Sequence, residues 1–169
     1  MSPGTDENSA FPVDPAERVN LILEVIVGAL GVDADVRVDE SDGNIHGIID
    51  GEDVGILIGR GGQTIDAIQF LCYRAAFRGA NDRRRVTVDA GGYREQRRLI
   101  VEDQAERAAA RALATGKEIE LDPMSATERR IVHNYLNERS GIETFSEGDE
   151  PDRYVVVAPT ATPDEQEES

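Results

Sequence analysis

Residues 59–62 (GRGG) form a glycine-rich loop between two predicted helices, a short one over 53–58 and a longer one over 63–78. Loops that bind nucleotide cofactors lie between a strand and a helix. The dinucleotide pattern G-x-G-x-x-G fails because its third glycine would fall on Thr64, and the P-loop pattern fails because no lysine follows a suitably spaced glycine. The sequence therefore disfavours a nucleotide cofactor at this loop.

Glycines in such a loop let the backbone approach a ligand closely, and free amides then face an anion at the positive end of the next helix. Arg60 adds a positive charge at the tip, and Ile56, Ile58 and Ile65 offer an apolar wall for unstacked bases. A plain turn between two packed helices is the alternative, in which the glycines are purely structural. The elements around the loop decide between the two readings.

Those elements follow in the order helix, strand, strand, helix, glycine loop, helix, strand. Hydrophobic spacing predicts a first helix over 17–30 and strands over 35–39, 45–49 and 84–89, and Asp42-Gly43 predicts a hairpin turn. Asp53 is expected to cap the short helix, and Gly79 to end the longer one. This layout resembles a type II KH domain over residues 19–89. The resemblance implies a GXXG loop that clamps about four nucleotides of backbone, made of Gly59, Arg60, Gly61 and Gly62.

A second small unit is predicted over residues 91–158. It has a long alanine-rich helix (93–114), a short strand (117–121), a helix (126–139) and two strands near 143–145 and 153–157. Ser125 and Glu128 have the spacing of a capping box at the start of the second helix. We therefore expect an α+β protein of two small domains: a KH-like unit (α-β-β-α-α-β) at 17–90, and an α/β-layered unit with a short antiparallel sheet at 91–158. Residues 1–16 and 159–169 are predicted to be disordered acidic tails.

Arg129 and His133 are four residues apart on the second of these helices, so they share one face. Such a pair suits a phosphate and a stacked base, although a solvated helix face is the alternative. The segments MSATERRIVH (124–133) and TFSEGDEP (144–151) resemble the domain named for its Arg-three-residues-His signature, which binds single-stranded nucleic acid. The residues expected to serve it are Arg129, Arg130, His133 and Asn137.

A KH domain followed by this second domain resembles the Jag family, the SpoIIIJ-associated RNA-binding proteins of bacteria, over residues 18–158. The resemblance implies a non-catalytic, cytoplasmic protein that binds single-stranded RNA, as an RNA chaperone or post-transcriptional regulator. It links the chain to control of cell elongation, division and envelope growth. It also implies a small partner protein that is little more than a KH domain. The resemblance allows either a homodimer or a heterodimer. Many family members carry an extra N-terminal domain, whereas about 17 residues precede the KH-like unit here.

The net charge of −16 argues against nucleic acid only until its distribution is considered. The first 17 residues carry four acids and no base, and from residue 147 onward there are eight acids and one arginine. Residues 60–98, by contrast, hold nine arginines and four acids. A basic strip beside the loop and an ordinary solvated face with Glu95 and Glu102 are equal alternatives for this stretch. The strip would consist of Arg84, Arg94, Arg97 and Arg98.

Other functional classes find little support in the sequence. A single cysteine, Cys72, excludes an internal disulfide, and its apolar helical surroundings predict a buried side chain. His46 and His133 are far apart and no acid pair or Ser/His/Asp arrangement stands out, so we expect no metal, no cofactor and no enzyme. No apolar run approaches the roughly 20 residues of a membrane span, and the N-terminus lacks the layout of a signal peptide, so no membrane insertion is expected.

Two alternatives to an RNA-binding regulator remain at this stage. The first is an interaction scaffold whose KH groove docks a partner protein. The second is a nucleic-acid-processing enzyme with an unrecognised site, which would turn RNA over. Dependence of RNA binding on the glycine loop separates the regulator from the scaffold.

Overall fold

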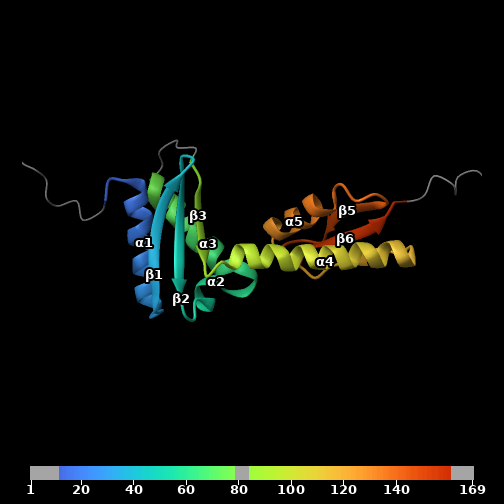
Figure 1. Ribbon diagram of the computed structural model, residues 1–169, viewed down its shortest axis with the longest axis horizontal. Coiled ribbons are helices and arrows are strands. Elements are labelled where there is room, and N and C mark those ends of the chain that lie inside the picture. The colour runs from blue at the N-terminus through green and yellow to red at the C-terminus, as the bar shows by residue number, and fades with distance from the viewer. Residues whose placement is uncertain (1–11, 79–83, 161–169) are drawn as a thin grey trace, which may run out of the picture. The chain divides into compact units, whose positions relative to one another are not determined.

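The computed structural model describes residues 12–78 and 84–160. The chain divides into two compact units, the first ending at Tyr93 and the second beginning at Arg94. Each unit combines helices with a small three-stranded sheet (Figure 1). The prediction of an α+β protein with two small domains is confirmed.

The first unit is built on the sheet β1-β2-β3, in which β1 and β2 run antiparallel and β2 and β3 run parallel. The chain of this unit has two glycine-rich segments, one between two helices and one after the last strand. Its elements occur in the predicted order: α1 (Pro15–Leu30), β1 (Ala34–Ser41), β2 (Asn44–Gly51), α2 (Gly55–Ile58), the 3₁₀ turn η1 (Arg60–Gly62), α3 (Gln63–Phe77) and β3 (Val86–Ala90).

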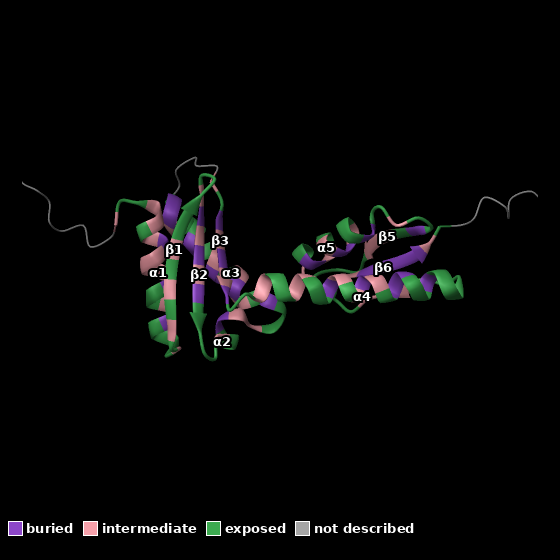
Figure 2. Cartoon of the chain, in the orientation of Figure 1, coloured by how far each residue is buried: buried purple, intermediate pink, exposed green. Residues whose placement is uncertain are grey.

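Helices α1 and α3 pack against each other and against the sheet. The alternate residues Ile45, Gly47 and Ile49 of β2 are buried, with both isoleucines at 0% exposure, and α1 buries Val19, Leu23 and Val27 (Figure 2). Gly47 lies in the same buried row of β2, because a Cβ there would lie 2.6 Å from a methyl of Leu23. The absent side chain allows α1 to approach the sheet closely.

Some predicted boundaries of the first unit were wrong. Helix α1 begins at Pro15, inside the predicted tail, because Asp14 accepts a 3.0 Å hydrogen bond from the Glu17 amide and proline suits the first helical turn. Asp53 does not cap α2: its φ is +56°, and the helix follows Val54 without a side-chain cap. Helix α3 ends at a left-handed Arg78, and Gly79 lies outside the described residues.

The second unit has an antiparallel sheet in the order β4-β6-β5, with β6 in the centre. The last strand pairs Pro159 with Ile142, so the second predicted tail begins one residue too early, and most of the remainder lies outside the described residues. The elements are α4 (Tyr93–Thr115), β4 (Ile119–Glu120), α5 (Ala126–Leu136), β5 (Ile142–Glu147) and β6 (Tyr154–Pro159).

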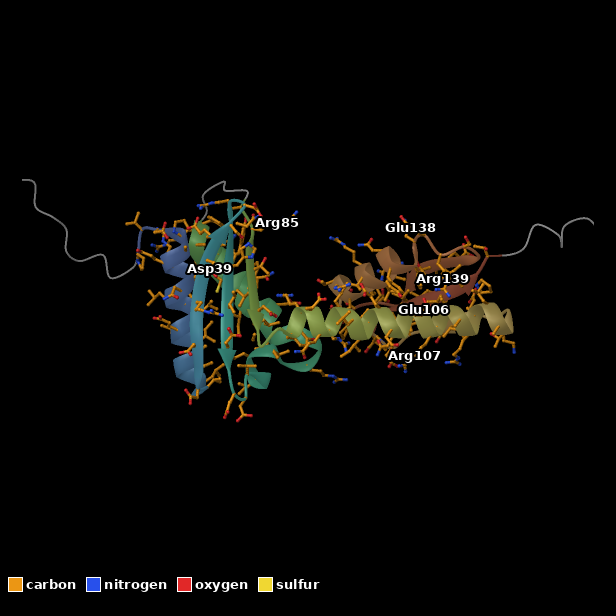
Figure 3. All side chains as sticks on the ribbon, viewed as in Figure 1. Asp39, Arg85, Glu106, Arg107, Glu138 and Arg139 are labelled. Carbon is orange, nitrogen blue, oxygen red and sulfur yellow. The ribbon has the colours of Figure 1, made fainter. Side chains whose placement is uncertain are left out.

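Alanines give α4 a flat face that packs into the core of this unit. Ala105, Ala108, Ala109 and Ala112 are buried there with Val132 and Leu136 of α5 and with Val155 and Val157 of β6. Two ion pairs also join α4 to α5 and the turn after it. They are Arg97–Glu128 at 2.6 Å and Arg139–Glu106 at 2.5 Å, of which the second is labelled in Figure 3.

Candidate nucleic-acid interface

The glycine loop connects α2 to α3 through three residues with positive φ: Gly59 (+72°), Gly61 (+58°) and Gly62 (+82°). A side chain is strained in this region of backbone space, which accounts for glycine at these positions. The two outer glycines are also tightly packed. A Cβ on Gly59 would lie 2.0 Å from the Thr64 hydroxyl, and one on Gly62 would lie 2.9 Å from a ring carbon of Tyr93.

The tip of the loop is open where the outer glycines are packed. Arg60 and Gly61 are both exposed, and a Cβ on Gly61 would meet nothing within 4 Å. A ligand can therefore reach the backbone at the tip, with the Arg60 guanidinium beside it. The loop thus has two packed outer glycines and an exposed apex.

Helix α3 starts at this loop without a capping side chain. The first turns of α1 and α5 are capped by Asp14 and Ser125, whose oxygens accept hydrogen bonds from backbone amides. The Gln63 amide already donates to the carbonyl of Arg60, so an external anion would meet the amides that follow it in the first turn, where no side chain caps the helix and the helix dipole favours negative charge. The loop and the helix end together suit a phosphate.

The predicted apolar wall is only partly present. Ile56 is 55% exposed and Ile58 is half-buried, so both present apolar surface next to the loop. The prediction for Ile65 was wrong, because its side chain is 0% exposed and packs in the core of the first unit. Ile65 anchors α3 to the core, and its side chain has no exposed surface for a base to contact.

The predicted basic strip is largely neutralised. Arg97 donates to the buried Glu128, and Arg98 forms ion pairs with Glu95 at 2.7 Å and Glu102 at 2.5 Å. The hydrogen bonds from Arg98 hold the pKa of Glu95 below its ordinary value. The ordinary-face alternative therefore describes Arg98 better than the strip does.

The remaining members of the strip give it no support as a free cationic surface. Arg84 lies 3.7 Å from the Glu40 carboxylate and stacks over the Phe77 ring at 5.3 Å. Arg94 is half-buried and also interacts with other groups. Both residues therefore have roles within the fold.

In the second unit, Arg129 and His133 do lie on one face of α5, but both are engaged within the unit. The Arg129 side chain is 11% exposed, forms an ion pair with Glu150, and donates from Nε to the carbonyl of Met124 at 3.4 Å. Glu150 lies in the segment that joins β5 to β6. The arginine thus holds this connection against α5.

His133 bridges α5 to strand β5 through both ring nitrogens. Nδ1 lies 2.7 Å from the Thr144 hydroxyl, and Nε2 lies 3.0 Å from the Ser146 hydroxyl. Partial burial, followed by the nearby charge of Arg129, lowers the pKa of His133. The imidazole is therefore held neutral at pH 7, with one nitrogen donating and the other accepting.

A neighbouring stripe of exposed polar residues runs along α5 and ends at Asn137, the residue after the helix. Arg130, Asn134 and Asn137 are all exposed and follow one another at spacings of four and three residues. Arg130 and Asn137 were predicted, and Asn134 was missed although the same spacing would have found it. This stripe presents one cation and two amides to solvent.

Sequence reasoning also missed two residues at the sites themselves. Tyr93 was taken only as a helix start, and its contact with Gly62 depends on the turn at Gly91-Gly92. Glu150 was part of a recognised segment, but its pairing with Arg129 joins residues 21 positions apart. Such contacts arise from the fold and leave no periodic signal in the chain.

Metal and membrane signals are scarce in the part of the chain that the structure describes. Over residues 12–78 and 84–160, no three His, Cys, Asp or Glu side chains gather as a metal site would require. Over the same residues, no helix is both long and apolar enough to cross a bilayer. Burial raises the pKa of the Cys72 thiol to about 12, so it remains protonated.

A helix-strand-strand-helix-loop-helix-strand unit with an open GXXG tip defines the first unit as a KH domain. Comparison with protein families agrees: the KH domain of KhpA/KhpB matches residues 17–88, and the domain named for its Arg-three-residues-His signature matches residues 95–159. The chain is thus a two-domain protein in which a KH domain precedes an Arg-three-residues-His domain.

Curated relatives combine the same domains. The chain is 35% identical over 148 residues to the RNA-binding protein KhpB of Bacillus subtilis, covering 86% of this chain and 71% of the relative. It is 35% identical over 138 residues to the protein of that name from Clostridium symbiosum, covering 80% and 62%. For that of Lactiplantibacillus plantarum the identity is 38% over 136 residues, covering 80% and 42%. The chain belongs to the Jag (KhpB) family, and it spans less than two thirds of the second and third of these relatives.

Proposed function

We propose that this chain binds single-stranded RNA without catalysing a reaction. The observation that carries the proposal is the open GXXG tip at the uncapped start of α3, where backbone amides, the helix dipole and Arg60 converge. A phosphate satisfies all three at once. The relatives named above, RNA-binding proteins with the same two domains, support the same function.

The RNA contacts divide between the two units. At the loop, the phosphate backbone is held by the tip while Ile56 and Ile58 present apolar surface to unstacked bases. In the second unit, Arg130 on α5 and Asn137 just after it offer charge and hydrogen bonds directly. Arg129 joins them only when a phosphate takes the place of Glu150, because the two side chains are already paired.

Family membership supports a proposal for the biological setting. We place the protein in the cytoplasm as an RNA chaperone or post-transcriptional regulator that acts in cell elongation, division and envelope growth. A small KH-only protein is its expected partner, as a heterodimer, and a homodimer is the alternative. The acidic tails at the two ends compete with RNA for the basic groups, so their removal is expected to tighten non-specific binding.

A scaffold function has one observation in its favour. Phe70 and Leu71, on the outer face of α3, are 62% and 53% exposed. Large apolar side chains that stay in solvent mark a surface that suits another protein. In this alternative the KH unit docks a partner and RNA is secondary.

An NMR titration with a short single-stranded RNA tests the proposal and separates these functions. We expect shift changes at the amides of residues 60–64 and at the α5 stripe Arg130, Asn134 and Asn137. Changes confined to the face of α3 that carries Phe70 and Leu71, or none at all, would contradict RNA binding through the loop. Intact RNA after a long incubation is the check on the absence of catalysis.

A further inference from the structure

Tyr93 packs directly on the fourth residue of the glycine loop. A Cβ added to Gly62 would lie 2.9 Å from ring carbon Cε1 of Tyr93, 3.1 Å from its hydroxyl and 3.4 Å from Cζ. The hydroxyl end of the ring therefore lies over the backbone of Gly62, which has a φ of +82°. The packing explains why even a methyl group is excluded at this position.

A two-glycine turn brings the tyrosine to this place. Gly91 and Gly92 follow β3 with φ values of +57° and +69°, and the Gly91 amide donates a 2.9 Å hydrogen bond to the carbonyl of Ile49 on β2. The turn is thus anchored to the sheet, and Tyr93 is the next residue. The ring is half-buried and also contacts the core of the first unit.

We propose that Tyr93 is a positioning residue of the RNA site, whose ring fixes Gly62 so that the loop tip and the start of α3 face a phosphate together. The inference rests on the proposed function of the loop. Gly62 is the N-cap of α3 and donates to the carbonyl of Gly59 at 3.3 Å, so its position sets both the helix start and the closure of the loop. Without the ring, Gly62 has a wider choice of backbone conformations, and the tip loses its fixed geometry.

The neighbouring contact shows how the loop is held on both sides. Gly59 packs on Thr64, which belongs to α3 itself, whereas Gly62 packs on a side chain from beyond β3. The second contact ties the loop to the residue that follows the turn after β3. Tyr93 is therefore a residue through which a distant part of the chain sets the shape of the loop.

The test compares Tyr93→Leu with Tyr93→Phe for affinity to a short single-stranded RNA, each alone and together with the loop change Arg60→Asp, Gly61→Asp. Leucine keeps apolar contact with the core but lacks the part of the ring that reaches Gly62. Phenylalanine keeps the ring and loses only the hydroxyl. We expect Tyr93→Leu to weaken binding about tenfold, within the coupling range of contacting residues. Tyr93→Phe should bind like the wild type. In the loop variant Tyr93→Leu should have no further effect.

Each outcome has one meaning, given that thermal unfolding verifies that every variant is folded. Unchanged affinity in Tyr93→Leu, or an equal loss with and without the loop change, would overturn the positioning role while leaving RNA binding by the loop intact. Binding by the wild type that does not depend on the loop change would instead overturn the proposed function, and with it this inference.

A suppressor pair gives an independent readout. Gly62→Ala places a methyl group against the ring and should abolish loop-dependent binding. Combining it with Tyr93→Leu opens space, so the double variant should bind better than Gly62→Ala alone, although the left-handed backbone still strains an alanine. A double variant no better than Gly62→Ala would show that relief of the ring contact does not restore the loop, which is the opposite of what this inference expects.

Discussion

Arg129 and His133 belong to a signature expected to bind nucleic acid, but both side chains bond to other residues of the second unit. The Arg129 side chain is 11% exposed and pairs with Glu150, while His133 bonds to two hydroxyls of β5. Spacing placed both residues correctly on one face of α5. It could not reveal that the partners come from residues 144–150, because those contacts depend on how the β5–β6 hairpin folds back on the helix.

Replacing Glu150 with glutamine should strengthen RNA binding. The change removes the carboxylate that competes with phosphate for Arg129, so affinity should rise about fivefold, which corresponds to the roughly 1 kcal/mol of a partly exposed ion pair. Glu147→Gln is the matched control, since Glu147 is in the same hairpin and accepts a hydrogen bond from the Tyr154 hydroxyl. An equal gain in both variants, measured by fluorescence anisotropy, would show only a change in net charge.

His133 gives the second unit a pH dependence of known sign. Burial lowers its pKa in the folded protein from the ordinary value of 6.5, so the unfolded chain binds the proton more readily. The contribution of His133 is therefore intact above pH 6.5 and is lost as the pH falls through its folded pKa. The free energy of unfolding of the wild type should fall more than that of His133→Gln between pH 7.5 and 5. Parallel pH profiles would contradict this assignment.

At the scale of elements, the order of helices and strands could be predicted because periodicity and glycine punctuation extend over whole segments. Helix caps and strand ends could not always be, since they depend on single contacts. Asp53 has the right chemistry for a cap but adopts a left-handed backbone that points the chain elsewhere. The wall of the loop was misassigned in the same way, because helical spacing alone does not distinguish the buried side of α3 at Ile65 from its open side.

Paired alanine changes on the two isoleucines separate stability from binding. Ile65→Ala should lower the free energy of unfolding by about 2–4 kcal/mol, as expected for a fully buried isoleucine. Ile56→Ala should cost less than about 0.5 kcal/mol, because the residue is mostly exposed, but it should weaken RNA binding. Chemical denaturation and RNA titration of both variants provide the check. A strong stability loss in Ile56→Ala would refute the assignment of that side chain to the binding surface.

Glu128 is the principal polar link between α4 and α5. One carboxylate oxygen accepts from the Ser125 amide at 2.9 Å, and the other accepts from Arg97 at 2.6 Å. Glu128→Ala should therefore lower the free energy of unfolding of the second unit by about 2–3 kcal/mol, from the lost cap and the broken, largely buried pair. Glu106→Ala breaks a more exposed pair with Arg139 and should cost less than about 1 kcal/mol. Equal losses in urea denaturation would mean that burial of Glu128 has no special weight.

On the scale of the whole molecule, a net charge of −16 and binding to a polyanion are compatible only if the contacts are local. We expect those contacts at the loop tip and at the exposed stripe of Arg130, Asn134 and Asn137, whereas Arg84, Arg97 and Arg98 interact with acids of the protein itself. The distribution of charges along the sequence could predict that basic groups concentrate in the middle of the chain. It could not predict which of them are neutralised by neighbours.

The most direct test of the central claim is the affinity for a short single-stranded RNA across a salt series, for the wild type and for Arg60→Asp, Gly61→Asp. Gly61 faces open space, and aspartate tolerates a left-handed backbone better than most residues, so the variant should fold. We predict that the wild type weakens with salt at a slope of several phosphate contacts and that the variant loses most of both affinity and slope. Equal affinity and equal slope in the two folded proteins would contradict RNA binding through the glycine loop.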